Sequence, residues 1–278
     1  MIVDLPDPII VLKGTLPPIA AALLLVSSGG SRWTAAAAAV GAYVAFGLLK
    51  EWPALPHELW SAPDGRQWLL WSLLAAVAAT TLERLRWLPT KLAPLLGVAV
   101  AAAAVWLTTL KLAQRWAGLD VLLYVGGGGL ALATLVLASR AAMARAPATI
   151  APAVVFSTML SLVAVLLTMA HSGLLGQLCG AVAAALGAAA GTVLWRRPFT
   201  LTAADGTWLG VAHGLFVLAG AHLADLPWSA AGLAMAAPLP LLLLRGTQGN
   251  PVRWTVLALV LTSLPLAGAG WLTLASSS

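Results

Sequence analysis

The feature that most constrains this chain is a succession of apolar runs, each about as long as the helix needed to cross a bilayer. We count ten, at residues 9 to 28, 33 to 50, 68 to 86, 91 to 111, 119 to 139, 149 to 171, 173 to 195, 207 to 224, 228 to 245 and 252 to 275. About 20 apolar residues span the hydrocarbon core as helix, and lipid cannot satisfy an open backbone. The sequence therefore predicts an all-α polytopic membrane protein with about ten transmembrane helices and no soluble domain.

Composition supports this class and excludes others. The chain is 61% hydrophobic and 9% charged, whereas about a quarter of the residues in soluble domains are charged. Its 15 Lys and Arg residues are scattered along the chain, nearly all near the ends of apolar runs, which is not the pattern of a nucleic-acid-binding face. A single cysteine, Cys179, cannot form an internal disulfide or a C-x-x-C metal site. Membrane lipid is the expected environment, and no cofactor is predicted.

The basic residues between the runs predict the orientation. Ten fall on one side and four on the other: Arg32, Arg84, Arg86, Lys91, Arg140, Arg145, Arg196, Arg197, Arg245 and Arg253 against Lys50, Arg66, Lys111 and Arg115. By the positive-inside rule the ten face the cytoplasm, which places both termini outside. The excess of arginine over lysine and the abundant alanine are typical of a GC-rich bacterial genome, so we expect a bacterial cytoplasmic (inner) membrane.

Acidic residues divide the opposite way. On the outer side the pattern puts Asp4, Asp7, Glu51, Glu58, Asp64, Asp120 and Asp225, and on the cytoplasmic side only Glu83 and Asp205. Acidic residues do not set topology. Their distribution agrees with the predicted orientation without deciding it.

The sequence pattern predicts an internal repeat of two five-helix units, residues 1–145 and 146–278. The stretch Ala62-Pro63-Asp64-Gly65-Arg66-Gln67-Trp68 has a relative in Ala203-Ala204-Asp205-Gly206-Thr207-Trp208. The starts of successive runs are 24, 35, 23 and 28 residues apart in the first half and 24, 34, 21 and 24 in the second. With five spans per unit, the second unit enters the membrane from the opposite side. The sequence therefore predicts inverted repeats.

This plan resembles the drug/metabolite transporter superfamily in its ten helices, its five-plus-five repeat and its length. The resemblance covers the architecture only, since no residue motif of that family is present and the predicted orientation is opposite. It implies a secondary transporter with a site near the membrane midplane between the repeats.

Breaks at matching positions of the two units suggest where such a site lies. The fifth run contains Gly126, Gly127, Gly128 and Gly129, and Pro265 in the tenth run corresponds to this glycine run. Four glycines remove the side chains from one helical turn. Either another helix packs on the bare backbone, or the helix opens and offers its carbonyl and amide groups to a ligand.

Two ionisable residues inside the runs are further candidates for substrate binding. Lys13 lies a few residues inside the first run and can reach the outer surface or serve as a counter-charge at a site. His213 lies in the middle of the eighth run, where an ionisable group is costly. A hydrogen bond from His213 to a carbonyl of a neighbouring helix is the structural alternative.

Other residue sets give weaker signals. His222 and Asp225, three residues apart, are weak candidates for metal binding, the alternative being a solvated acidic rim. Asp64 and Asp205 each precede glycine at a helix start, and we expect each to cap its helix; the alternative is a role in substrate gating. Cys179, Arg197 and His213 resemble in type and order the residues of exosortase-type membrane transpeptidases. They are closer together than in that family, and Cys179 lies in an apolar run, so we expect no enzyme.

The function that these features favour is a secondary transporter or flippase of an apolar or amphiphilic small molecule. Few charges lie within the runs, which argues against a strongly ionic substrate. The alternative is a non-catalytic membrane scaffold subunit that packs against other membrane subunits of a larger complex. Its supporting feature is the abundance of small residues, which permits close helix contacts.

Overall fold

The architecture is helical wherever it is described. The computed structural model describes residues 8–50, 52–61, 64–85, 87, 89, 91–192, 199–244 and 250–276, and within these ranges it contains helices and no strand. The predicted helical class is therefore confirmed for this part of the chain. Some charged residues used to predict the orientation lie outside the described residues, namely Asp4, Asp7, Glu51, Arg86, Arg196, Arg197 and Arg245.

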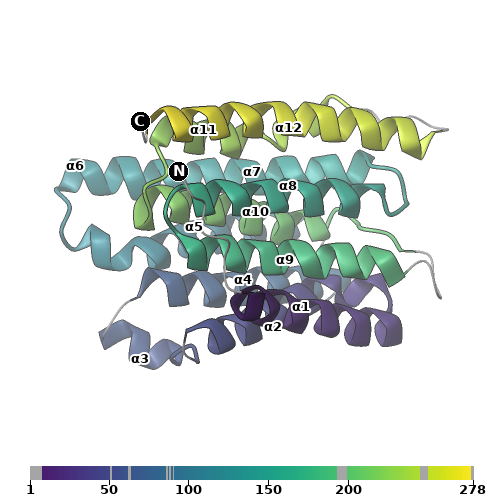
Figure 1. The fold of residues 1–278 in the computed structure, drawn as a ribbon, viewed down its shortest axis with the longest axis horizontal. Helices are drawn as coiled ribbons and strands as arrows, with labels where there is room; N and C mark the ends of the chain where they lie inside the picture. Colours follow the sequence, from purple (N-terminus) through teal and green to yellow (C-terminus); the bar gives the residue numbers. More distant parts are fainter. Residues whose placement is uncertain are drawn as a thin grey trace.

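The helices follow the predicted apolar runs. Their bounds are α1 (Pro8–Gly29), η1 (Ser31–Trp33), α2 (Thr34–Leu49), α3 (Pro56–Ser61), α4 (Gly65–Arg84), α5 (Ala93–Ala113), α6 (Gly118–Val121), the π-helical turn η2 (Leu122–Gly126), α7 (Gly127–Arg145), α8 (Ala151–Met169), α9 (Gly173–Gly191), α10 (Asp205–Leu223), α11 (Trp228–Ala236), η4 (Leu239–Leu242) and α12 (Pro251–Ser276). The long helices lie side by side, with α11 and α12 at one edge and α1 to α3 at the other (Figure 1).

Eight helical stretches in the described residues are long and apolar enough to cross a membrane. The chain is thus a helical protein of the polytopic membrane class. The two remaining predicted spans correspond to α4, which has charged residues near both ends, and to the shorter apolar stretch Trp228–Leu242. The count of ten spans stays a prediction.

Helix α10 is the centre of the bundle. Every residue from Asp205 to Gly220 is buried, and α10 packs against α4, α5, α7, α8, α9 and α11. By contrast, α1 and α12 expose most of their apolar side chains. Lipid can cover an apolar helix face, whereas small and polar residues favour contact with other helices, so the glycines of α10 together with Asp205 and His213 favour its central position.

Small residues let the helices approach closely. A Cβ on Gly41 of α2 would lie 2.3 Å from the Cα of Pro18 in α1, and one on Gly65 of α4 would lie 2.3 Å from the carbonyl oxygen of Thr108 in α5. Real Cβ atoms do not tolerate such distances, so only glycine fits at these crossings. In membranes, packing of this kind replaces the hydrophobic effect as the force that holds helices together.

Helices α4 and α10 pack antiparallel along their whole length. The start of α4 lies beside the end of α10, where a Cβ on Gly65 would be 3.2 Å from Leu223. At the other end, Arg84 of α4 contacts Asp205 of α10. Helices α4 and α10, each of which begins at an Asp-Gly pair, therefore contact each other.

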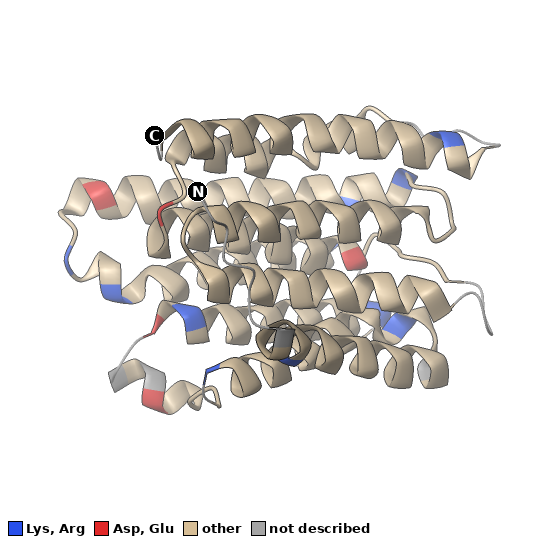
Figure 2. Ribbon diagram, in the orientation of Figure 1, with Lys and Arg blue, Asp and Glu red and all other residues tan. Residues whose placement is uncertain are grey.

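The charged residues lie mainly toward the two ends of the bundle (Figure 2). One end holds Arg32, Arg84, Arg140, Arg145 and Arg253, the described arginines of the predicted cytoplasmic side. Figure 2 shows acidic residues mostly at the opposite end. An uncharged middle with charged ends is the arrangement expected of helices that cross a bilayer.

Candidate functional site

A buried ion pair joins the end of α4 to the start of α10. The Arg84 guanidinium contacts Oδ2 of Asp205, and these side chains are 14% and 1% exposed. The same oxygen accepts hydrogen bonds from the backbone N–H of Thr202 at 2.7 Å and from the Thr202 hydroxyl at 2.9 Å. Three donors therefore converge on one carboxylate oxygen.

A second ion pair continues from the first into α7. Arg140 donates through both terminal nitrogens to the Glu83 carboxylate, at 2.6 Å and 2.8 Å. Its Nη1 also donates to the Thr207 hydroxyl of α10 at 2.7 Å. Glu83, Arg84, Arg140 and Asp205 thus form what we call the charged network, which links α4, α7 and α10.

The local sequence explains how these helices meet. Glu83 and Arg84 are consecutive, and successive helical side chains point about 100° apart. One therefore reaches α7 and the other reaches the start of α10. Between Asp205 and Thr207 stands Gly206, where a Cβ would lie 2.5 Å from the backbone nitrogen and Cα of Arg140. Because Gly206 has no side chain, α10 lies close enough to α7 for the Thr207 hydroxyl to accept a hydrogen bond from Arg140.

The two Asp-Gly pairs differ in what the aspartate does. Asp64 caps α4 as predicted, since its Oδ1 accepts the Arg66 N–H at 2.9 Å. The prediction that Asp205 caps α10 is wrong, because Ala204 holds the cap position. The Asp205 carboxylate accepts from Thr202, which precedes the helix, and pairs with Arg84. The local Thr202 and the distant Arg84 thus together hold the Asp205 carboxylate.

The charged network is incompletely satisfied. Neither Oδ1 of Asp205 nor Nε of Arg84 has a hydrogen-bond partner among the described residues, although both atoms are buried. Removing charges from water is expensive unless the remaining polar atoms are also paired. Ionisable residues kept inside a membrane bundle at such expense are candidates for a functional site.

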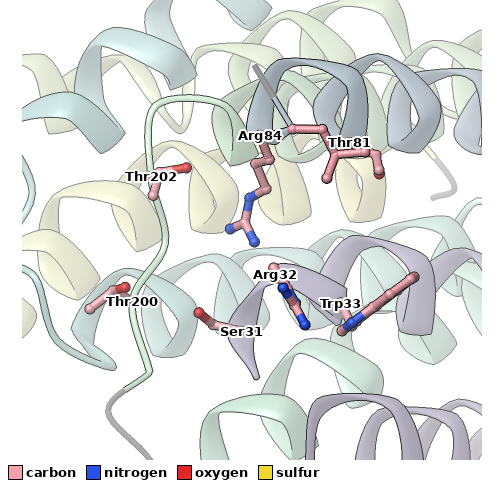
Figure 3. Close-up of a pocket in the computed structure, with 8 residues that line it drawn as sticks. Ser31, Arg32, Trp33, Thr81, Arg84, Thr200 and Thr202 are labelled. Atoms are coloured by element: carbon pink, nitrogen blue, oxygen red, sulfur yellow. The ribbon is translucent and has the colours of Figure 1, made fainter. Parts of the chain in front are cut away.

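A cavity adjoins this network at the same end of the bundle. It has a volume of about 430 Å³ and is lined by Ser31, Arg32, Trp33, Thr81, Arg84, Leu85, Thr200 and Thr202. Figure 3 shows the Arg84 guanidinium extending from the end of α4 into the space above η1, with Arg32 and Trp33 on the facing wall. We call this space the arginine cavity. It combines two guanidinium groups, four hydroxyls and two large apolar side chains.

The predicted site at the glycine run has a different character. Gly126 to Gly129 are helical, and a Cβ on Gly128 would lie 3.4 Å from Val105 of α5 and 3.8 Å from Leu218 of α10. Helix α7 packs mainly on α5 and α10, whereas α12, which carries Pro265, packs mainly on α8 and α11. The structure therefore does not bring the glycine run and Pro265 together on one surface.

Lys13 and His213 also lie apart from each other. Lys13 is exposed and lines a second cavity of about 340 Å³, together with Lys50 and Gln177, toward the predicted outer end. His213 is fully buried, with its Nε2 2.8 Å from the carbonyl oxygen of Ala234 in α11. This contact has the geometry of a hydrogen bond to a neighbouring helix, which is the structural alternative to substrate binding by His213.

His222 and Asp225 face different surroundings. The His222 ring lies among Trp116, Tyr124 and Trp228, with ring centroids 5.5, 5.9 and 4.9 Å away. The exposed Asp225 has its Oδ2 3.8 Å from Nδ1 of His171. In the part of the chain that the structure describes, no three His, Cys, Asp or Glu side chains group as metal ligands. His222 packs with Trp116, Tyr124 and Trp228 in what we call the aromatic cluster.

The residues of the transpeptidase-like set are distributed between helices. Cys179 is buried in α9, and its thiol donates to the carbonyl oxygen of Leu160 in α8 at 3.2 Å. His213 lies in α10 and Arg197 lies outside the described residues. Cys179 is thus enclosed in the contact between α8 and α9.

Sequence reasoning treated Glu83, Arg84 and Arg140 only as charges at helix ends, and Asp205 as a helix cap. A signal was present, because Glu83 and Asp205 are the only acidic residues on the strongly basic side. Each exception pairs with one of the arginines there. An acidic residue that departs from the charge pattern is therefore a useful marker of an ion pair between helices.

Comparison of the chain with known protein families, characterised proteins and solved structures finds no match.

Proposed function

We propose that this chain is a membrane carrier or flippase for an amphiphilic small molecule, built from two inverted five-helix units of residues 1–145 and 146–278. It would reside in a bacterial cytoplasmic membrane with both termini outside. The arginine cavity would be its cytoplasmic opening, and the charged network would close the path beyond it. We propose no catalytic role.

The packing of equivalent helices supports the inverted units. Helices α4 and α10 are the third long helices of their halves and lie antiparallel in contact. Their neighbours α2 and α9, the second of each half, also contact each other. A two-fold axis in the membrane plane would bring equivalent helices together antiparallel. These two contacts are compatible with such an axis, whereas the contact of α7 with α10 has no counterpart of similar extent between α12 and α4.

The observation that carries the proposal is the Arg84–Asp205 pair, because it joins these equivalent helices at one end and borders a cavity. Breaking this ion pair would remove the direct charged contact between the ends of α4 and α10. The unsatisfied Oδ1 of Asp205 and Nε of Arg84 lower the stability of the closed arrangement. A contact of this kind is suited to a gate that opens and closes.

The test is lipid movement in reconstituted liposomes. Protein would be inserted into vesicles that contain phosphatidylglycerol with a fluorescent acyl chain, and dithionite would then be added outside. Protein-free vesicles lose about half of the signal. We expect active protein to expose the inner-leaflet probe as well, and heat-inactivated protein to expose none. Identical decay for active protein and protein-free vesicles would contradict the flippase.

The scaffold alternative has one observation in its favour, which is that Gly128 in the glycine run packs against α5 and α10. Against it, the small residues of α9 are used within the chain, since Ala183, Ala185 and Ala189 are buried. Mass measurement after gentle extraction separates the two functions. Stable recovery with other membrane subunits favours the scaffold, and recovery as a chain bound only to lipid favours the carrier.

A further inference from the structure

We propose that the cavity at the predicted outer ends of α1, α2 and α9 binds the headgroup of one anionic phospholipid, with Lys13 as the partner of its phosphate. We call this space the lysine cavity. Its walls include Lys13, Gln177 and four apolar residues, Ile10, Leu48, Leu49 and Leu174. The site requires no transport, so it goes beyond the proposed function and is compatible with a carrier and with a scaffold subunit.

The lysine cavity lies where three long helices meet. Each of α1, α2 and α9 packs against the other two. At their junction, a Cβ on Gly14 would lie 3.7 Å from Leu49 of α2 and 3.8 Å from Gln177 of α9. Gly14 follows Lys13 directly in α1, so helix packing fixes the backbone from which the lysine side chain extends.

Lys13 supplies a positive charge that no described residue neutralises. It is exposed within the first spanning stretch, Ile9–Ser28, and neither an ion pair nor a hydrogen bond joins its ammonium group to another residue in the described ranges. Lys50 differs, because its Nζ lies 3.7 Å from Oδ2 of Asp64. An ionisable residue within a spanning helix is costly and calls for a partner. Lys13 is therefore the residue of this cavity that a ligand anion would pair with.

The depth of Lys13 indicates where that anion comes from. Lys13 is four residues past Ile9, which is about 6 Å along the helix axis at 1.5 Å per residue. A lysine at this depth extends its ammonium group to the level of the lipid headgroups. The phosphate groups of phospholipids lie at that level and are the anions closest to the cavity.

The remaining lining fits a headgroup that is joined to acyl chains. The Gln177 amide is half-buried and makes no hydrogen bond to another described residue, so its donor and acceptor groups can both bind headgroup oxygens. The volume of about 340 Å³ is near the lower end of small-molecule sites, about 300–1,000 Å³. Ile10 and Leu16, three residues before and after Lys13, lie on the same helix face and are 41% and 56% exposed. Acyl chains therefore have an apolar surface beside the cavity.

The test is the binding of the first lipid to the full chain in neutral detergent, measured by native mass spectrometry. The probes are phosphatidylglycerol and phosphatidylcholine with identical acyl chains, and glycerol phosphate. Phosphatidylcholine carries the same phosphate beside a cation, so it tests whether net negative charge matters. Glycerol phosphate tests whether a water-soluble ester is sufficient.

The variants separate charge, amide and position. Lys13→Gln removes the charge, Lys13→Arg keeps it, and Gln177→Leu removes the amide while leaving every charge in place. Lys111→Gln is the matched control, because Lys111 is an exposed lysine near the end of the span Ala93–Ala113, at the same end of the bundle, and does not line the cavity. Lys13 is exposed and has no protein partner to lose, so we expect Lys13→Gln to unfold at the same temperature as the unmodified chain without lipid.

We expect phosphatidylglycerol to bind more tightly than phosphatidylcholine. Lys13→Gln should weaken this binding about fivefold, the factor that corresponds to about 1 kcal/mol for each basic residue near a lipid surface. Gln177→Leu should weaken it about threefold through the loss of a hydrogen bond. Lys13→Arg and Lys111→Gln should leave the Kd within about twofold of the unmodified chain.

Equal binding of the two lipids would overturn the inference. So would a Lys13→Gln protein that binds phosphatidylglycerol as tightly as the unmodified chain, or as tightly as Lys111→Gln. Glycerol phosphate that binds as well as phosphatidylglycerol would overturn the lipid assignment, because the apolar wall would then contribute nothing. None of these measurements needs lipid movement, so failure of the liposome assay removes the flippase and leaves this site standing.

Discussion

At the scale of single residues, the two Asp-Gly pairs show that the same dipeptide can have different structural roles. Asp64 is a third exposed, caps its helix and lies 3.7 Å from Lys50. Asp205 is buried and is held by Arg84, which is 121 positions earlier in the chain. Asp205 also has a local partner, since Thr202 donates to it through its backbone N–H and its hydroxyl. The difference comes from which helix end each aspartate meets after folding.

This difference predicts unequal effects of one substitution. Asp205→Asn leaves the buried Arg84 charge without a partner, and we expect a loss of about 3–5 kcal/mol in unfolding free energy. Asp64→Asn keeps a capping side chain and loses only a partly exposed ion pair, so we expect a loss of less than about 1 kcal/mol. Unfolding by detergent titration measures both.

The double variant Arg84→Gln with Asp205→Asn is the control for charge. It removes both members of the pair, and we expect it to recover most of the stability that Asp205→Asn loses. A double variant no more stable than Asp205→Asn would show that the loss arises from packing.

At the scale of helices, substitutions in the glycine run of α7 distinguish close helix packing from ligand binding. A Cβ on Gly128 would meet Val105 and Leu218, whereas one on Gly127 would meet nothing within 4 Å. We expect Gly128→Leu to destabilise the protein by about 1–3 kcal/mol through overpacking. Gly127→Leu is expected to be neutral or to stabilise by up to about 1 kcal/mol. Equal stability of the two variants would contradict this packing.

The close contact of α10 with α7 at Gly206 predicts a similar loss of stability next to the charged network. Gly206→Ala places a methyl group 2.5 Å from the Arg140 backbone, so α10 must move away and Thr207 must withdraw from Arg140. We expect a loss of at least about 1–3 kcal/mol, seen as a lower unfolding temperature. Gly232→Ala in α11 is the control, because a Cβ there has no neighbour within 4 Å, and it should unfold like the unmodified protein.

Sequence reasoning worked for helices and failed for contacts between them. The predicted run 207 to 224 matches α10, Asp205–Leu223, because a spanning helix is encoded by its own residues. The charged network depends on residues 57 and 121 positions apart, and their meeting is decided by which helices are neighbours. Local spacing holds no information about that. The glycine run likewise gave two interpretations, since bare backbone suits a helix neighbour as well as a ligand.

At the scale of the whole molecule, the two ends of the bundle are built differently. One end carries the charged network and the arginine cavity. Toward the other lies the aromatic cluster of Trp116, Tyr124, His222 and Trp228, whose rings pack 4.9 to 5.9 Å apart. An end with buried ion pairs and an end with packed rings are suited to different parts in the proposed carrier. The opening is expected at the charged end.

The orientation of these ends in the membrane decides which compartment supplies a ligand. In a Cys179→Ala background, Asp225→Cys places a thiol at an exposed position of the aromatic end, and Val252→Cys places one at the charged end. In intact bacterial cells, we expect a membrane-impermeant maleimide to label only Asp225→Cys, because the ten basic residues hold the charged end in the cytoplasm. Both should be labelled after permeabilisation. Labelling of Val252→Cys alone would reverse the orientation, and the arginine cavity would then lie at the outer side of the membrane.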